Sequence, residues 1–233
     1  MKSLRRGAGD IAGREELDAR RSVIFVRHAQ TAWACEGRYQ GRSDPPLSRQ
    51  GIEEAKAVAA RLRDCGIAAV ISSPLSRALH TAQIIAAALN LASPGIEPHL
   101  MEVAYGDWEG LTQQEVRARW PRQLRQWKSA PAAFEFPGGE SLAAASARLF
   151  RFLGEQYARF DADPRPIVAV THCGLIRLAV LEACAAPIER FRHVRVEHGS
   201  AHRFVLQSRD TYGKWSLWLE GDSCAASGMR GST

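Results

Sequence analysis

Short apolar runs rich in β-branched residues recur along the chain and predict the strands of a parallel sheet. Three of them cover Ser22–Val26, Ile67–Ser72 and Pro166–Thr171. Continuous apolar runs of this length are typical of strands that are buried on both faces. Two more runs, residues 203–208 (RFVLQS) and 215–220 (WSLWLE), predict closing strands that lie antiparallel near the edge of the sheet.

Between these runs the apolar residues recur at helical spacing. The first two patterns consist of Ile52, Ala55, Val58, Ala59 and Leu62, and of Leu75, Leu79, Ala82, Ile85 and Leu89. Further helices are predicted over Gln113–Trp127, Ser141–Tyr157 and Gly174–Cys184. Alternating strands and helices are the signature of a parallel sheet with right-handed crossovers. The sequence therefore predicts an α/β protein with three layers, α/β/α, around a mostly parallel central sheet.

The two ends of the chain lack such a pattern. Residues 1–20 and 221–233 are polar and patternless, so we expect both to be loose tails. No repeat and no low-complexity linker divides the stretch between them. This predicts a single domain over residues 21–220.

Composition narrows the classes of function. The chain has 233 residues, of which 45% are hydrophobic and 24% charged, as is ordinary for a soluble enzyme. It contains no apolar stretch near the roughly 20 residues of a membrane span, and its N-terminus lacks the apolar core of a signal peptide. Its five cysteines form no C-x-x-C pair, and reduced thiols are the simplest interpretation. We therefore expect a cytoplasmic protein with no membrane partner.

The formal net charge of +6 raises the question of an anionic partner. Basic residues that bind nucleic acid gather in a patch or a stripe, whereas here they are scattered among acidic residues and some crowd the N-terminus. We therefore expect no nucleic acid as a partner. A small anionic substrate fits the charge equally well.

Charged and polar residues directly follow three of the predicted buried strands. Arg27 and His28 follow the first strand, SSPLSR with Arg77 follows the second, and THCG with His172 follows the last. In an open α/β sheet, ligands bind beyond the carboxyl ends of the strands. Parallel neighbours would bring all three loops to the same rim.

Arg77 and His172 each have a structural and a functional interpretation. Ser73 as an N-cap and Pro74 as the first helical residue place Arg77 in the first turn of a helix. A cation there opposes the helix dipole by roughly a few tenths of a kcal/mol, so Arg77 either bends into solvent or faces a bound phosphate. His172 is either a satisfied structural histidine or a phosphate ligand. Gly174 after it opens another helix, whose backbone donors suit an anion.

Six motifs occur in a fixed order. They are RHAQTAW (27–33), GRYQGRSDPPLSRQG (37–51), SSPLSRALHTAQII (72–85), LMEVAYGDWEGL (100–111), FPGGES (136–141) and VTHCGLIR (170–177). In this order they resemble the histidine phosphatase superfamily, in its phosphoglycerate-mutase-like branch. The resemblance covers roughly residues 23–177, and several ordered motifs are far more specific than one Arg-His pair.

The resemblance implies a phosphohistidine mechanism. His28 matches the nucleophile of the family. The role suits a histidine, because a neutral imidazole nitrogen attacks phosphorus without first losing a proton. Arg27, Arg77 and, if protonated, His172 match the phosphate-binding groups, and they supply charged donors for the charge spread over the phosphoryl group. These cations take the place of a metal, and we find no carboxylate cluster that suggests one. We therefore expect neither a metal nor a cofactor.

Glu102 matches the acid of the family, which protonates the leaving alcohol and then activates water. Asp107 and Glu109 are nearby rivals, for which loop solubility and capping are the commoner explanation.

Four more residues are predicted to contact or support the substrate. Gln40 and Gly41 lie in the loop that matches the family's phosphate-proximal segment. Thr31 either supports the loop of the nucleophile by hydrogen bonding or simply caps a turn. Cys173 follows the second histidine, and its backbone N–H lies at the expected floor of the pocket.

The chain also departs from the family pattern. Ala29 and Gln30 stand where members often have Gly and Glu, Ala34 stands where many have asparagine, and Cys173 replaces the usual glycine. None of these changes removes His28, Arg27, Arg77, Glu102 or His172. Each one does weaken the argument that this chain acts on the same substrate as a relative.

The length of the insertion near the site separates phosphatases from mutases. A mutase must hide its phosphohistidine from water, which normally requires a long covering insertion with additional cations. Here the insertion, about residues 103–140, holds one helical pattern with Trp120 and Trp127. We expect it to form a small helical cap over the carboxyl-end rim, and its shortness favours hydrolysis of a phosphate monoester.

Among phosphatases, the compact cap and the FPGGES and HCGLIR contexts are similar to the α-ribazole phosphatases of cobalamin assembly. The specific substrate predicted is therefore α-ribazole 5′-phosphate. The alternatives are, in order, a broad-specificity or sugar-phosphate phosphatase, a phosphoglycerate mutase and a non-catalytic phosphate-binding protein. Exposed apolar residues on the closing strands would make a homodimer plausible.

Overall fold

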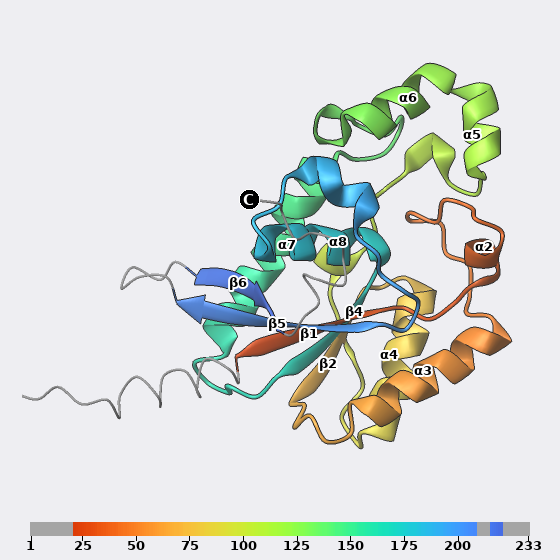
Figure 1. The fold of residues 1–233 in the computed structure, drawn as a ribbon. Coiled ribbons are helices and arrows are strands. Elements are labelled where there is room, and N and C mark those ends of the chain that lie inside the picture. Colours follow the sequence, from red (N-terminus) through yellow and green to blue (C-terminus); the bar gives the residue numbers. More distant parts are fainter. Residues whose placement is uncertain (1–20, 209–214, 221–233) are drawn as a thin grey trace, which may run out of the picture.

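One six-stranded sheet, in the order β3-β2-β4-β1-β5-β6, forms the middle of the fold (Figure 1). The structure is a computed structural model and describes residues 21–208 and 215–220, so both predicted tails lie outside the described residues. The strands are β1 (Ser22–Arg27), β2 (Ala69–Ser72), β3 (Gly95–Ile96), β4 (Ile167–Thr171), β5 (Ala201–Ser208) and β6 (Trp215–Leu219).

The four strands β1 to β4 are parallel, and the two closing strands are antiparallel. β4 lies between β1 and β2, with Val23 opposite Ile167 and Ala69 opposite the same residue. β5 pairs antiparallel with β1, and β6 pairs antiparallel with β5. The predicted α/β class, with a mostly parallel sheet and antiparallel closing strands, is confirmed.

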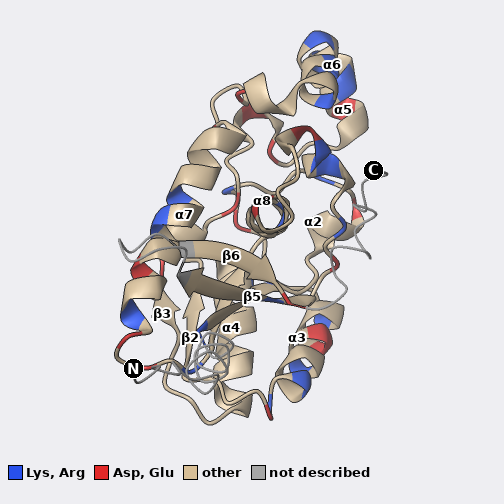
Figure 2. Cartoon of the chain, turned by 60° about the vertical axis from the view of Figure 1, so that its left-hand side comes forward, with Lys and Arg blue, Asp and Glu red and all other residues tan. Residues whose placement is uncertain are grey.

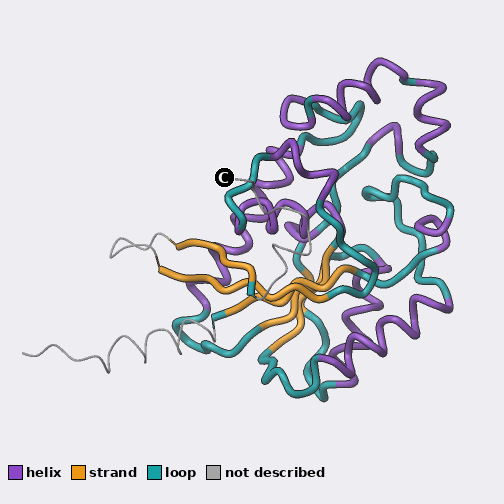
Figure 3. Tube along the Cα trace, in the orientation of Figure 1, coloured by secondary structure: helices purple, strands orange, loops and turns teal. Residues whose placement is uncertain are grey.

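Helices cover both faces of the sheet, as Figure 3 shows. The helices are α2 (Ala32–Cys35), α3 (Arg49–Arg61), α4 (Ser76–Ala88), α5 (Gln113–Arg119), α6 (Pro121–Ser129), α7 (Leu142–Arg159) and α8 (Cys173–Ala183). Alternate residues of β1 point to opposite faces, as the period of a strand requires. Ile24 and Val26 pack in one core with α3 and α4, whereas Val23 and Phe25 pack in the other with α7 and α8.

The cap consists of two short helices rather than the single helix predicted over 113–127. α5 ends at Arg119 and α6 begins at Pro121, whose ring cannot continue a helix from the preceding turn. Trp127 is buried against the rings of Phe136 and Phe191, at centroid distances of 4.8 and 5.8 Å. This tryptophan therefore anchors the cap to the main body. The basic residues of the cap, which colour α5 and α6 blue in Figure 2, are exposed.

Other expectations need correction. The edge strand β3 was not predicted, because its two residues leave no apolar run; it pairs with β2 at Ile71 and Ser72. Three short 3-10 turns near the site are η1 (Pro98–Leu100), η2 (Gly106–Trp108) and η4 (Ile188–His193), and η3 (Pro131–Ala133) follows the cap. The expectation of five reduced thiols is wrong at Cys184, which is disulfide-bonded.

No helix in the described ranges is long and apolar enough to cross a membrane.

Candidate active site

The ends of β1, β2 and β4 meet at one edge of the sheet, as the sequence predicted. The backbone N–H of His28 donates to the carbonyl of Thr171 at 2.9 Å, and that of Ser73 donates to Val170 at 3.0 Å. The rings of His28 and His172 are consequently only 5.0 Å apart between centroids. The three loops form a single buried site.

The imidazole of His28 is held in one tautomer. Its Nδ1 lies 2.8 Å from the carbonyl oxygen of Ala29, which can only accept, so Nδ1 carries the proton. Nε2 therefore keeps its lone pair and faces Nε of Arg77 at 3.3 Å. Burial lowers the pKa of His28 well below its usual range, and Arg77 and Arg27 lower it further. The ring is therefore neutral at pH 7, which is the state that the predicted role of a nucleophile requires.

Arg77 does not bend into solvent, so the structural interpretation of this residue is wrong. Its side chain is fully buried, and its two Nη atoms donate to the carbonyls of Gln40, Gly41 and Ser43 at 2.8–2.9 Å. Burial lowers the pKa of Arg77, but an arginine keeps its charge. The guanidinium thus holds the loop at residues 40–43 against the nucleophile.

The start of α4 differs from the prediction that Ser73 is its N-cap. The N-cap is Leu75, which offers no side-chain oxygen, and the helix begins at Ser76. Asp44 caps it instead, because its Oδ1 accepts from the backbone N–H of Ser76 at 2.8 Å. The same oxygen lies 3.7 Å from Nη1 of Arg77. A carboxylate thereby offsets the conflict between Arg77 and the helix dipole.

The side chain of Ser73 contacts His172 instead of capping α4. Its Oγ lies 2.8 Å from Nε2 of His172, whereas Nδ1 of this ring is buried without a partner. Burial, and after it the charge of Arg77, lower the pKa of His172 well below its usual range. The expectation of a third charged donor therefore needs correction, because the ring is neutral at pH 7. It offers a neutral donor when Nδ1 carries the proton.

Arg27 offers a second unused donor. Nη1 donates to the carbonyl of Val196 at 2.6 Å and Nη2 to the ring of His198 at 2.7 Å. Nε of Arg27 is buried and has no partner. Buried polar groups are normally paired, so the two unpaired nitrogens on Arg27 and His172, which lie beside His28, are available to a ligand.

Glu102 lies at the N-terminus of α8. Its carboxylate accepts from the backbone N–H of Gly174, 3.1 Å from both oxygens, and Oε1 also accepts from Val103 at 2.9 Å. A Cβ atom at position 174 would lie 2.4 Å from Oε1, so only glycine permits this approach. The helix dipole favours a carboxylate here.

Two residues that the sequence reasoning missed hold the segment around Glu102. Arg148 of α7 donates to the carbonyls of His99, Met101 and Glu102. Its guanidinium also pairs with Glu140 at 2.8 Å, and Glu140 accepts from the N–H of Ala104 at 2.9 Å. The FPGGES motif contains Glu140 and was the available signal, but nothing in the sequence linked it to Arg148.

Glu109 has a structural role, as expected. Its carboxylate accepts from the backbone N–H groups of Arg42, Ser43 and Tyr105 and from the hydroxyl of Ser43. It thereby joins the loop at residues 40–43 to the segment that bears Glu102. Asp107 is exposed.

The predicted substrate-contact residues lie around the same site. Thr31 fits both of its interpretations, because it caps α2 through Ala34 N–H and also donates to Oε1 of Gln40 at 2.7 Å. The side-chain amide nitrogen of Gln40 makes no hydrogen bond to the described residues. Gly41 is needed for close packing, since a Cβ there would lie 1.9 Å from Oε1 of Glu109. Cys173 is half-buried at the first position of α8.

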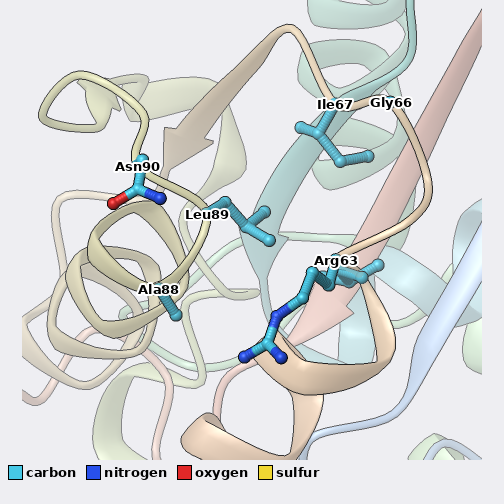
Figure 4. A pocket seen from close by; sticks show the side chains of 7 residues that line it. Arg63, Gly66, Ile67, Ala88, Leu89 and Asn90 are labelled. Carbon is cyan, nitrogen blue, oxygen red and sulfur yellow. The ribbon is translucent and has the colours of Figure 1, made fainter.

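A separate pocket lies at the opposite edge of the sheet (Figure 4). Its lining residues, which include Arg63, Ile67 and Leu89, precede β2 or lie at the C-terminal end of α4. It therefore sits at the amino ends of the strands, away from the predicted residues. Within residues 21–208 and 215–220, the one group of potential metal ligands is Glu97, His99 and Glu155, and it includes no predicted site residue.

Comparisons with known proteins agree with this geometry. The chain is 36% identical over 187 residues to phosphoserine phosphatase 1 of Hydrogenobacter thermophilus, covering 80% of this chain and 87% of that protein. It is 31% identical over 184 residues to the adenosylcobalamin/α-ribazole phosphatase of Salmonella typhimurium, covering 75% and 85%. A solved mycobacterial glucosyl-3-phosphoglycerate phosphatase with VO3 superposes with a TM-score of 0.76 at 26% identity, over 86% of this chain and 97% of that one.

The family profile decides the assignment. The profile of the histidine phosphatase superfamily (branch 1) matches residues 23–218, a range that includes all but the first residue of β1 and the last residue of β6 and almost all of the described chain. The relatives named above are all phosphatases. The chain belongs to the histidine phosphatase superfamily, branch 1, and is a phosphatase of that superfamily.

Proposed function

We propose that the protein hydrolyses phosphate monoesters of small metabolites through a phosphohistidine formed on His28, without a metal. One observation carries this proposal most directly. Nε2 of His28 lies 3.3 Å from Nε of Arg77, and two residues beside His28, Arg27 and His172, each have a buried nitrogen without a partner. A phosphoryl group bound there meets a nucleophile and donors that are already oriented, which is what phosphoryl transfer requires.

In the first step, Nε2 of His28 forms a bond to phosphorus as the bond from phosphorus to the ester oxygen breaks. The proton stays on Nδ1, which still donates a hydrogen bond to the carbonyl of Ala29, so the ring becomes a phosphorylated imidazolium. Arg27 and Arg77 offset the charge on the phosphoryl oxygens. In the tautomer with the proton on Nδ1, His172 donates to the phosphoryl group from Nδ1 while its Nε2 accepts from the hydroxyl of Ser73.

Glu102 acts in both steps in this proposal. Oε1 already accepts two backbone N–H groups, whereas Oε2 shares only that of Gly174, so we assign the transferable proton to Oε2. It passes to the leaving alkoxide and gives the alcohol. The carboxylate then takes a proton from water as the water oxygen attacks phosphorus and the bond from phosphorus to Nε2 breaks. The electron pair of that bond returns to Nε2, and the products are inorganic phosphate and free, neutral His28.

The short cap supports hydrolysis over mutase activity. The two helices α5 and α6 span residues 113–129, and Trp127 packs in the core rather than facing the site. For the substrate, relatives named for α-ribazole phosphate and for phosphoserine support small polar monoesters. We keep α-ribazole 5′-phosphate as the specific proposal and phosphoserine as the alternative, with action in the cytoplasm.

A panel of monoesters tests this proposal. The purified chain is incubated in EDTA with α-ribazole 5′-phosphate, phosphoserine, glucosyl-3-phosphoglycerate, 3-phosphoglycerate and 4-nitrophenyl phosphate. We expect release of inorganic phosphate, and acid-labile label on His28 when the reaction is quenched early. Isomerisation of 3-phosphoglycerate without release would favour a mutase. Inactivity on every substrate, with retained binding of phosphate, would favour the non-catalytic alternative.

A further inference from the structure

The loop at residues 194–200, between η4 and β5, also reaches the site, although it is not among the three strand ends. The backbone N–H of Arg27 donates to the carbonyl of Ser200 at 3.0 Å, and its carbonyl accepts from Gly199 at 3.2 Å. Both backbone groups of Arg27 are thus paired with this loop.

The same loop binds the side chain of Arg27. Nη1 donates to the carbonyl of Val196 at 2.6 Å, and Nη2 lies 2.7 Å from Nε2 of His198. A guanidinium only donates hydrogen bonds, so Nε2 of His198 is the acceptor. Of the five N–H groups of Arg27, these two bonds leave three, including the Nε–H that is buried without a partner.

His198 is in the right state to accept. Burial and the neighbouring Arg27 lower its pKa to about 4, so the ring is neutral at pH 7. Its centroid lies 6.1 Å from that of His28. The ring is close to His28 but makes its hydrogen bond to Arg27.

Both helix layers fix the loop that carries His198. Arg61 of α3 donates to the carbonyl of Gly199 at 2.7 Å, and Arg177 of α8 donates to that of Val194 at 2.9 Å. Gly199 has a φ of +62°, which favours glycine. The acceptor is therefore held in place by the main body and not by Arg27 alone.

We propose that His198 is a positioning residue, which orients the guanidinium of Arg27 so that its remaining N–H groups face the transferred phosphoryl group. This inference rests on the proposed function, because it takes that site as the place of phosphate. An arginine that is oriented before the substrate arrives loses less side-chain freedom on binding. Removal of the acceptor would therefore weaken the binding of phosphate itself.

The test compares two substitutions of one residue. His198→Leu removes the acceptor, whereas His198→Gln keeps an oxygen near the position of Nε2. We expect His198→Leu to weaken the binding of inorganic phosphate, measured by calorimetry, and to raise KM for a monoester, each by roughly tenfold or more, as for loss of a hydrogen bond to a charged group. His198→Gln should restore both to within about threefold. His80→Leu, on the exposed side of α4, is the matched control.

A double-mutant cycle separates positioning from general stability. When Arg27 is already replaced by Met, His198→Leu should weaken phosphate binding no further. A lower Tm with unchanged phosphate affinity, or losses that simply add, would overturn the proposal. If the wild type binds phosphate but hydrolyses no monoester, the proposed function fails while the phosphate arm still decides the role of His198. A wild type that binds no phosphate overturns both.

Discussion

The site has two walls, which are built in different ways. The wall proposed to bind phosphate, the phosphate wall, consists of Arg27, His28, Arg77 and His172, and these residues stand at the ends of β1 and β4 and in the first turn of α4. The acid wall consists of Glu102 and the segment to Gly110, in which the 3-10 turn η2 is the one regular element. Side chains from distant parts of the chain, Arg148 and Glu140, hold this second wall.

The difference indicates that binding and proton transfer depend mainly on different side chains, although Glu109 and the N-terminus of α8 contact both walls. The sheet and its helices position the phosphate wall, so damage to the acid wall should leave phosphate affinity unchanged. The acid wall depends on a few charged hydrogen bonds from Arg148, which a single substitution removes. Variants of the two walls should therefore have different kinetic signatures.

The largest effect is expected for His28→Ala in the phosphate wall. Loss of the nucleophile removes the covalent route, and turnover of every monoester should fall by at least about 10⁴-fold. Inorganic phosphate should still bind, because three of the four residues of the wall remain. Phosphate release and calorimetry measure the two quantities. An alanine variant with near-wild-type turnover would exclude His28 as the nucleophile.

Glu102→Gln in the acid wall is the next largest. Glutamine keeps the size of the side chain but has no proton to give, so kcat on alkyl monoesters should fall by roughly 10²–10⁴-fold. The loss should be much smaller on 4-nitrophenyl phosphate, because its leaving group departs without a proton. Phosphate affinity should not change. Equal losses on both substrates would contradict the role of Glu102 as the acid.

The phosphate wall could be predicted from the sequence because its backbone positions follow from local patterns. Apolar runs locate the strands, and parallel neighbours place His28 and His172 at one edge. The neutral state of His172 could not be predicted, since it depends on full burial and on the charge of Arg77. A pattern gives the place of a side chain but not its electrostatic surroundings.

The acid wall was predicted only at Glu102, and only through the resemblance. Arg148 binds the carbonyl of Glu102 from 46 positions along the chain, and Arg27 and His198 are 171 positions apart. Such pairs follow no periodic pattern, because the fold alone brings them together. The break between α5 and α6 is different, since Pro121 gave a local signal that the helical pattern of apolar residues concealed.

Arg148→Met should have an intermediate effect on the acid wall. Without the guanidinium, three carbonyls around Glu102 lose their donor and the carboxylate shifts. We expect kcat on alkyl monoesters to fall by about 10–100-fold, with phosphate affinity unchanged. Arg151→Met, on an exposed face of the same helix, is the matched control and should retain wild-type kcat. A loss of phosphate affinity in Arg148→Met would show that the two walls are not separate.

The smallest effect is on stability at low pH, and it should arise from the phosphate wall. The pKa values of His28 and His172 lie well below the usual 6.5 in the folded chain. As the pH falls below about 6.5, these two histidines bind protons in the unfolded chain but not in the folded chain. The free energy of unfolding therefore declines by up to about 1.4 kcal/mol per pH unit for each of them. Their contribution is complete above that pH and is lost towards the lower folded pKa values. Urea unfolding at pH 7.5, 6.5 and 5.5 measures the free energy of unfolding. It should decline less steeply with falling pH in His172→Asn than in the wild type. In Glu102→Gln, which keeps both histidines, the histidine contribution to the decline should remain. Equal slopes for His172→Asn and the wild type would mean that His172 is not held neutral by the fold.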